Sequence, residues 1–163
     1  MTQTEQAQPA VDLLLESLDT FTRGHGLDVT LESDIEFPSV YVNFVGEDEN
    51  FFQKNHGEAL RDLSFLMMTL VEKHFPDLEL EIKVDSGGFI AAKEAELRGM
   101  AESAAARARD TGNQVLLNPL NPYERRLVHM ALQDYEDVET ESLGEGHLKR
   151  IAVRVVEGEP SEA

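Results

Sequence analysis

The stretch Asn118–Arg154 reads NPLNPYERRLVHMALQDYEDVETESLGEGHLKRIAVR and begins with a well-marked helix start. Asn121 can cap a helix, Pro122 suits the first helical position, and Glu124 lies three residues after the cap. The spacing predicts a helix over residues 122–133. Its apolar side chains fall on one broad arc, formed by Tyr123, Leu127, Val128, Met130, Ala131 and Leu132.

Polar side chains gather on the opposite face of this predicted helix. They are Arg125, Arg126, His129 and Gln133. Arg125 and His129 are four residues apart, so they stand side by side on the helix surface. The chain carries a formal net charge of −18, and such a concentration of basic groups is therefore unusual within it.

A longer pattern surrounds the pair. Arg125-x-x-x-His129 is preceded by NPYER and followed by V-x-T-x-S-x-G-E-G and by Lys149-Arg150, which lead into an Ile/Val strand. This combination resembles the Arg-x3-His domain as it occurs in the bacterial Jag (SpoIIIJ-associated) family. Members of that family join a KH domain to an Arg-x3-His domain and are regarded as binders of single-stranded nucleic acid, chiefly RNA. The resemblance implies non-enzymatic binding of single-stranded RNA, or of DNA, mainly through the second domain.

The resemblance places Arg125 and His129 at the centre of the site. A guanidinium can donate two hydrogen bonds to a phosphate, and an imidazole can donate another or stack on a base. Further cations and neutral donors are expected from Arg126, Lys149, Arg150, Ser142, Gly144 and Gly146. Alternatively, Arg125 pairs with a neighbouring carboxylate, and His129 is a half-buried helix residue. The candidate carboxylates are Glu124, Glu139 and Glu141. Because the surrounding motif is intact, we favour the binding role.

The first half of the chain predicts an α+β unit over residues 10–84, preceded by a disordered segment at 1–9. Helical stripes and strand alternation suggest, in order, a helix at 10–23, strands at 27–31 and 40–44, a short helix at 48–53, a helix at 57–74 and a strand at 78–84. This order resembles a type II KH domain. The fold class expected for the whole chain is therefore α+β with two small domains.

The second domain is expected over residues 85–156, with a boundary at the Ser86-Gly87-Gly88 turn. An alanine-rich helix at 89–110 and a short strand at 114–117 precede the helix described above. Two strands then follow around the Gly-Glu-Gly turn, at 138–142 and 148–156. Residues 157–163 are expected to form a disordered acidic tail.

The KH-like half departs from its family at the loop that normally grips phosphates. KH domains use a G-x-x-G loop, whose glycines allow close backbone approach and whose middle residues are usually basic. The corresponding residues here are Lys54, Asn55, His56 and Gly57. One interpretation is a weakened phosphate clamp. The other, which we favour, is a KH-shaped scaffold that no longer binds nucleic acid, because a clamp needs positive charge and close approach together.

Composition limits the other classes of function. The 163 residues include no cysteine, which excludes disulfides and thiolate metal sites, and the five histidines show no metal-ligand spacing. No nucleotide-binding glycine loop or nucleophile elbow occurs. We therefore expect neither an enzyme nor a cofactor or metal. With no apolar run of membrane length and no signal peptide, a cytoplasmic protein is the default.

Charge argues against nucleic-acid binding as a whole but is unevenly distributed. Residues 1–60 hold two basic and twelve acidic side chains, whereas residues 85–156 hold nine basic and twelve acidic ones. The second half is thus less hostile to phosphate. The main alternative function is a protein-interaction adaptor with little nucleic-acid affinity, whose partner binds the KH-like domain.

Overall fold

The computed structural model describes residues 3–156 and divides the chain into two compact units, Met1–Ala91 and Ala92–Ala163. Each unit packs helices against a three-stranded sheet. The α+β class expected from the sequence is therefore confirmed. No helix within the described residues is long and apolar enough to cross a membrane. The acidic tail expected at 157–163 lies outside the described residues.

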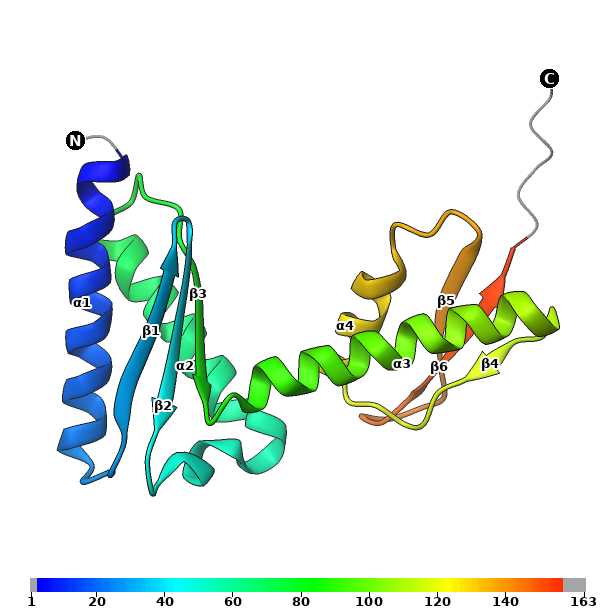
Figure 1. Cartoon of the computed structure of the whole chain (residues 1–163), viewed down its shortest axis with the longest axis horizontal. Coiled ribbons are helices and arrows are strands. Elements are labelled where there is room, and N and C mark those ends of the chain that lie inside the picture. Colours follow the sequence, from blue (N-terminus) through cyan, green and yellow to red (C-terminus); the bar gives the residue numbers. More distant parts are fainter. Residues whose placement is uncertain (1–2, 157–163) are drawn as a thin grey trace. The chain divides into compact units, whose positions relative to one another are not determined.

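The first unit follows the predicted order of elements, shown in Figure 1. They are α1 (Gln3–Gly24), β1 (Thr30–Glu36), β2 (Ser39–Val45), the 3-10 helix η1 (Glu49–Gln53), α2 (Lys54–His74) and β3 (Glu81–Ser86). The strands lie in the order β1-β2-β3, with β1 antiparallel and β3 parallel to β2. The parallel pair requires a crossover connection, which η1 and α2 supply.

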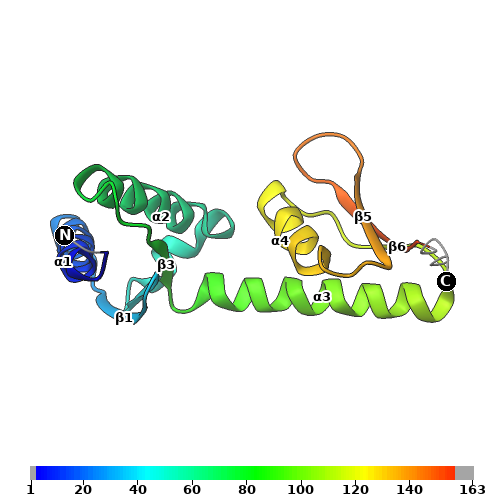
Figure 2. The same ribbon diagram turned by 90° about the horizontal axis from the view of Figure 1, so that it is seen from above.

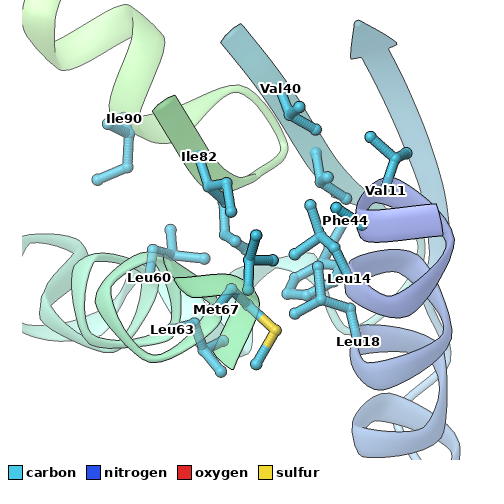
Figure 3. Close-up of a cluster of buried hydrophobic side chains, with 14 of the residues drawn as sticks. Val11, Leu14, Leu18, Val40, Phe44, Leu60, Leu63, Met67, Ile82 and Ile90 are labelled. Carbon is cyan, nitrogen blue, oxygen red and sulfur yellow. The ribbon is translucent and has the colours of Figure 1, made fainter. Parts of the chain in front are cut away.

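The core of the first unit lies between the sheet and the helices α1 and α2 (Figure 3). Alternate residues of β2 are buried, as are Ile82 and Val84 of β3, because successive strand side chains point to opposite faces. Helical stripes from α1 and α2 meet them. The main helical contributors are Val11, Leu14, Leu18, Leu60, Leu63 and Met67. Burial of these apolar surfaces is the chief stabilising term of this unit.

The N-terminal helix begins earlier than expected. The sequence predicted disorder at 1–9, but α1 begins at Gln3 and contains Pro9 within its first turns. The Thr-Glu-Gln-Ala segment before this proline consists largely of good helix formers, and Ala10 directly after it is fully buried. Packing of the next residues therefore extends the helix toward the N-terminus.

The turn between β3 and α3 (Phe89–Thr111) belongs to the first unit, so the boundary moves from the expected position at 84/85 to 91/92. Asp85 is fully buried at the end of β3. Its carboxylate accepts hydrogen bonds from the backbone nitrogens of Ile90 (2.8 Å) and Ala91 (3.0 Å) and from the Tyr41 hydroxyl (2.7 Å). These bonds hold the first turn of α3 to the sheet, which glycine-rich turn chemistry alone does not reveal.

The loop expected to correspond to the KH clamp has an unusual backbone. Asn55, His56 and Gly57 have φ values of 52°, 57° and 71°, so one turn of left-handed backbone precedes the regular part of α2. Gly57 is buried, and a Cβ placed there would lie 2.7 Å from the Ile90 Cδ1 atom. The surviving glycine is therefore required by packing and by its positive φ, quite apart from any phosphate.

Replacement of Gly57 with alanine is expected to destabilise the first unit by about 2–4 kcal/mol, because left-handed backbone and overpacking each carry a penalty. Urea unfolding followed by circular dichroism measures this change. Gly24 at the end of α1 is the matched control, since a Cβ there meets nothing within 4 Å. Gly24→Ala should change stability by less than about 1 kcal/mol. Equal stability of the two variants would contradict the packing role of Gly57.

The second unit contains most of α3, followed by β4 (Val115–Leu116), α4 (Pro122–Leu132), β5 (Val138–Leu143) and β6 (Arg150–Val155). The sheet is antiparallel in the order β4-β6-β5. Small residues of α3 allow it to approach the sheet closely. The buried cluster comprises Leu97, Ala101, Ala104, Ala105, Leu117, Leu120, Val128, Leu132, Val138, Ile151 and Val153. This core holds α4 and β5 together (Figures 1 and 2).

Candidate nucleic-acid interface

The start of α4 is fixed by the capping box that the sequence predicted. The Asn121 side chain accepts a hydrogen bond from the Glu124 nitrogen (2.9 Å), and the Glu124 carboxylate accepts one from the Asn121 nitrogen (3.0 Å). Lys93 of α3 places its Nζ atom 3.7 Å from the same carboxylate, which is almost fully buried. Glu124 is thus occupied by the cap and by Lys93 and does not pair with Arg125.

The buried stripe of α4 is narrower than the apolar arc suggested. Glu124, Val128 and Leu132, spaced four residues apart, are the buried residues of the helix. Met130 was expected on the apolar arc, but 48% of it is exposed. Because Met130 lies four residues after Arg126, it shares the solvent-facing side of the helix with the basic residues.

Strand β5 presents neutral hydroxyls to α4 and carboxylates to the other side of the sheet. Successive side chains of a strand alternate between faces, so Thr140 and Ser142 lie on the α4 side. Glu139 and Glu141 lie on the opposite side, where both contact Arg154 of β6 at 3.1 and 3.4 Å. The alternative pairing of Arg125 with these two glutamates is therefore wrong. Their charges are directed away from α4.

His129 bridges α4 to the two hydroxyls of β5. Its Nδ1 atom lies 2.6 Å from the Thr140 hydroxyl and its Nε2 atom 3.2 Å from the Ser142 hydroxyl. Partial burial lowers the pKa of His129 below its ordinary value of 6.5, and the positive charge of Arg125 lowers it further. The imidazole is therefore largely neutral at pH 7, with one nitrogen donating and the other accepting.

Arg125 is held by backbone carbonyls and keeps donors to spare. Its Nη1 atom donates to the Leu120 oxygen (2.7 Å) and to the His147 oxygen (2.9 Å), so the side chain ties α4 to the turn between β5 and β6. Among the described residues, neither Nε nor Nη2 has an acceptor, and no carboxylate pairs with the guanidinium. This leaves an oriented cation with free hydrogen-bond donors.

These elements enclose an open hollow of about 490 Å³ between α4 and β5. Its lining combines the basic face of the helix with the hydroxyls of the strand: Pro122, Arg125, Arg126, His129, Met130, Leu132, Gln133, Val138, Thr140 and Ser142. The lining holds two arginines and no carboxylate, although the whole chain has a net charge of −18. No group of three or more possible metal ligands occurs in the part of the chain that the structure describes.

The structure brings together four of the eight residues expected at this site: Arg125, Arg126, His129 and Ser142. Lys149, Arg150, Gly144 and Gly146 do not line the hollow. Arg150 pairs with Leu143 in the β5–β6 register, two positions from Glu141 on the same strand face. Its side chain therefore lies across the sheet from His129.

Four polar or apolar residues of the lining were not predicted as site residues from the sequence. Met130 and Gln133 line the hollow beside Arg126, and Thr140 makes the shorter of the two contacts with His129. Pro122 closes one end. The period-two pattern Thr140-x-Ser142 was the available signal, since it predicts that both hydroxyls lie on one strand face.

Similarity to a known domain family identifies the second unit. The pattern of the Arg-x3-His domain family matches residues 95–155, a range that includes α4 and the strands around the hollow. Residues 95–155 form an Arg-x3-His domain. The arginine and the histidine for which the family is named are neighbours on α4 in this chain, at positions 125 and 129.

Two relatives extend the similarity beyond the Arg-x3-His domain. The RNA-binding protein KhpB of Clostridium symbiosum is 28% identical over 144 residues, which cover 88% of this chain and 64% of that protein. KhpB of Lactiplantibacillus plantarum is 28% identical over 131 residues, or 79% of this chain and 40% of its own. The chain thus spans less than two thirds of the length of either relative. The resemblance to the Jag family is confirmed over most of this chain.

Proposed function

We propose that this protein binds single-stranded nucleic acid, RNA in the first instance, through the hollow of its Arg-x3-His domain. The observation that carries the proposal is the lining of that hollow, which has two arginines and no carboxylate in a strongly acidic chain. Because phosphate affinity depends on local cations, an isolated basic hollow is where a nucleic-acid strand meets the least repulsion.

The lining residues suit distinct parts of a nucleotide. The free Nε and Nη2 donors of Arg125 can bind a phosphate in bidentate fashion, with Arg126 adding charge at the rim. The neutral His129 and the hydroxyls of Thr140 and Ser142 offer uncharged hydrogen bonds. Met130 and Pro122 supply apolar surface for a base or a sugar. No catalytic role is proposed, since the relatives are named as RNA-binding proteins.

The KH-like unit contributes less in this proposal. Lys54 places its Nζ atom 5.7 Å from the centre of the Phe51 ring, and Gly57 is buried against Ile90. The basic side chain and the close backbone approach that a phosphate clamp combines are thus engaged elsewhere. We propose that most affinity resides in the Arg-x3-His domain, and that the protein acts in the cytoplasm, where RNA is accessible.

Fluorescence anisotropy with labelled single-stranded RNA, and with the equivalent DNA, tests the proposal at low and at physiological salt. We expect saturable binding that weakens as salt rises, because bound cations displace counterions from the strand. A duplex of the same sequence should bind more weakly, since its bases are not available for contact. Absence of binding even at low salt would refute the proposed function.

The affinity should also depend on pH through His129. A bound phosphate favours the imidazolium, so the pKa of His129 in the complex lies above its lowered value in the free protein. Binding therefore takes up a proton, and affinity should rise as pH falls through the pKa of the complex, levelling off below the free pKa. The gain is about tenfold for each unit by which the two pKa values differ. His129→Gln should abolish this dependence, whereas the control His56→Gln should retain it.

A further inference from the structure

The KH-like unit exposes a group of large apolar side chains on α2. Phe65, Leu66 and Met68 are 68%, 55% and 39% exposed. Exposed side chains of this size within a single helical turn form a continuous apolar surface, unlike the scattered apolar residues that are normal on proteins. The inward-facing Leu63 and Met67 of the same helix are buried in the core, so the exposed group is additional to the packing of the unit.

A hollow of about 300 Å³ adjoins this surface. Met68 belongs to both, and the rest of the lining comes from the end of α2 and the segment leading into β3: Val71, Glu72, Pro76, Leu78, Glu79, Leu80 and Ile82. Its size suits one or two inserted apolar side chains of a partner. The surface of Phe65, Leu66 and Met68 together with this hollow is called the α2 surface below.

Acidic side chains border the α2 surface. Asp62 lies three residues before Phe65 on the helix, and Glu72 lies four residues after Met68, so both adjoin the apolar group. Glu79 joins Glu72 in the hollow. Lys73, seven residues after Leu66, is the one cation added on that side. The border is therefore negative on balance.

We propose that the α2 surface binds a basic amphipathic helix of a partner protein. The partner's apolar stripe would cover Phe65 and Leu66 and insert a side chain beside Met68, while its lysines or arginines meet Glu72 and Glu79. Helix-in-groove recognition of this kind uses apolar anchors three or four residues apart. Complementary charge at the border sets the choice of partner.

Charge excludes two other occupants. Residues 1–91 hold 18 acidic and five basic side chains, so a second copy would bring like charges together around the apolar contact. Nucleic acid would face the same repulsion without neighbouring cations. A basic helix gains from both the apolar group and the border.

A titration with a synthetic lysine/leucine peptide tests the proposal on the full chain. The peptide has about 18 residues, enough for a stable helix on binding, and carries a fluorescent label. Its control has the same composition in an order that breaks the apolar stripe. At physiological salt, the patterned peptide should bind saturably and the scrambled one roughly tenfold more weakly or not at all. Equal binding of the two would mean attraction to net charge alone and would overturn the proposal.

Substitutions locate the site. Phe65→Ser should weaken binding of the patterned peptide roughly tenfold or more, as expected for loss of an aromatic anchor. Glu72→Gln with Glu79→Gln should weaken it and reduce its salt dependence. The matched control is Phe37→Ser, because Phe37 is also an exposed phenylalanine of this unit (48%) but lies between β1 and β2. An equal loss in Phe37→Ser, or no loss in Phe65→Ser, would refute the assignment.

Two further measurements separate the outcomes. Analytical ultracentrifugation should show that the free chain does not self-associate through this surface, and a dimer abolished by Phe65→Ser would identify a second copy as the occupant and overturn the proposal. RNA titrations of Phe65→Ser should match those of the wild type. The peptide site and the hollow of the Arg-x3-His domain lie in different units, so failure of either leaves the other standing.

Discussion

Replacing Asp85 with alanine should lower the free energy of unfolding of the KH-like unit by about 3–5 kcal/mol, the range for stranding several buried donors. The fully buried carboxylate accepts four hydrogen bonds. The donors are the backbone nitrogens of Ser86 (2.7 Å), Ile90 (2.8 Å) and Ala91 (3.0 Å) and the hydroxyl of Tyr41 (2.7 Å). Alanine would leave these donors unpaired and would remove the negative charge from the N-terminus of α3.

Urea unfolding followed by circular dichroism measures the loss, and amide hydrogen exchange at Val42 and Phe44 assigns it to this unit. Asp85→Asn keeps one acceptor oxygen and should lose about half as much stability. Asp34→Ala is the matched control, because Asp34 is an exposed aspartate of β1 with no hydrogen bond or ion pair among the described residues. A loss in Asp85→Ala no larger than in this control would show that the carboxylate does not anchor α3.

Replacing both Arg125 and His129 with alanine should weaken binding of single-stranded RNA about 100-fold at low salt, since charged hydrogen bonds contribute roughly 1.5–3 kcal/mol each. The double substitution removes the oriented guanidinium and the imidazole that lines the hollow with it. Anisotropy titrations measure the change, and the salt dependence should also become shallower as a cation is lost.

Arg150→Ala is the control for this prediction. It removes a charge of the same sign from the same domain, but the β5–β6 register places Arg150 across the sheet from the hollow. We expect a change of about twofold or less, as for a charge remote from the site. If Arg150→Ala weakens binding as much as the double variant, the nucleic acid follows the basic sequence pattern and the hollow is not the binding surface. Circular dichroism confirms that each variant is folded.

Local sequence determined much of this protein. The capping box at Asn121 and the four-residue spacing of Arg125 and His129 depend on backbone geometry within two helical turns, so they could be predicted from the residues alone. The succession of helices and strands was predictable for the same reason, because hydrophobic periodicity is a local property. The Arg-x3-His pattern also indicated the family, which the match over residues 95–155 confirms.

Contacts between distant segments decided what remained. Alternation shows that Thr140 and Ser142 share a face of β5, but only the packing of α4 against that face brings them to His129 and turns Glu139 and Glu141 toward Arg154. The register of β6 likewise removes Arg150 from the site.

The same holds in the first unit, where the burial of Asp85 and the contact of Gly57 with Ile90 join residues from different elements. Periodicity determines which side chains share a face. Which face meets which neighbour depends on the packing of the whole core, and in this protein that choice assembles the basic hollow.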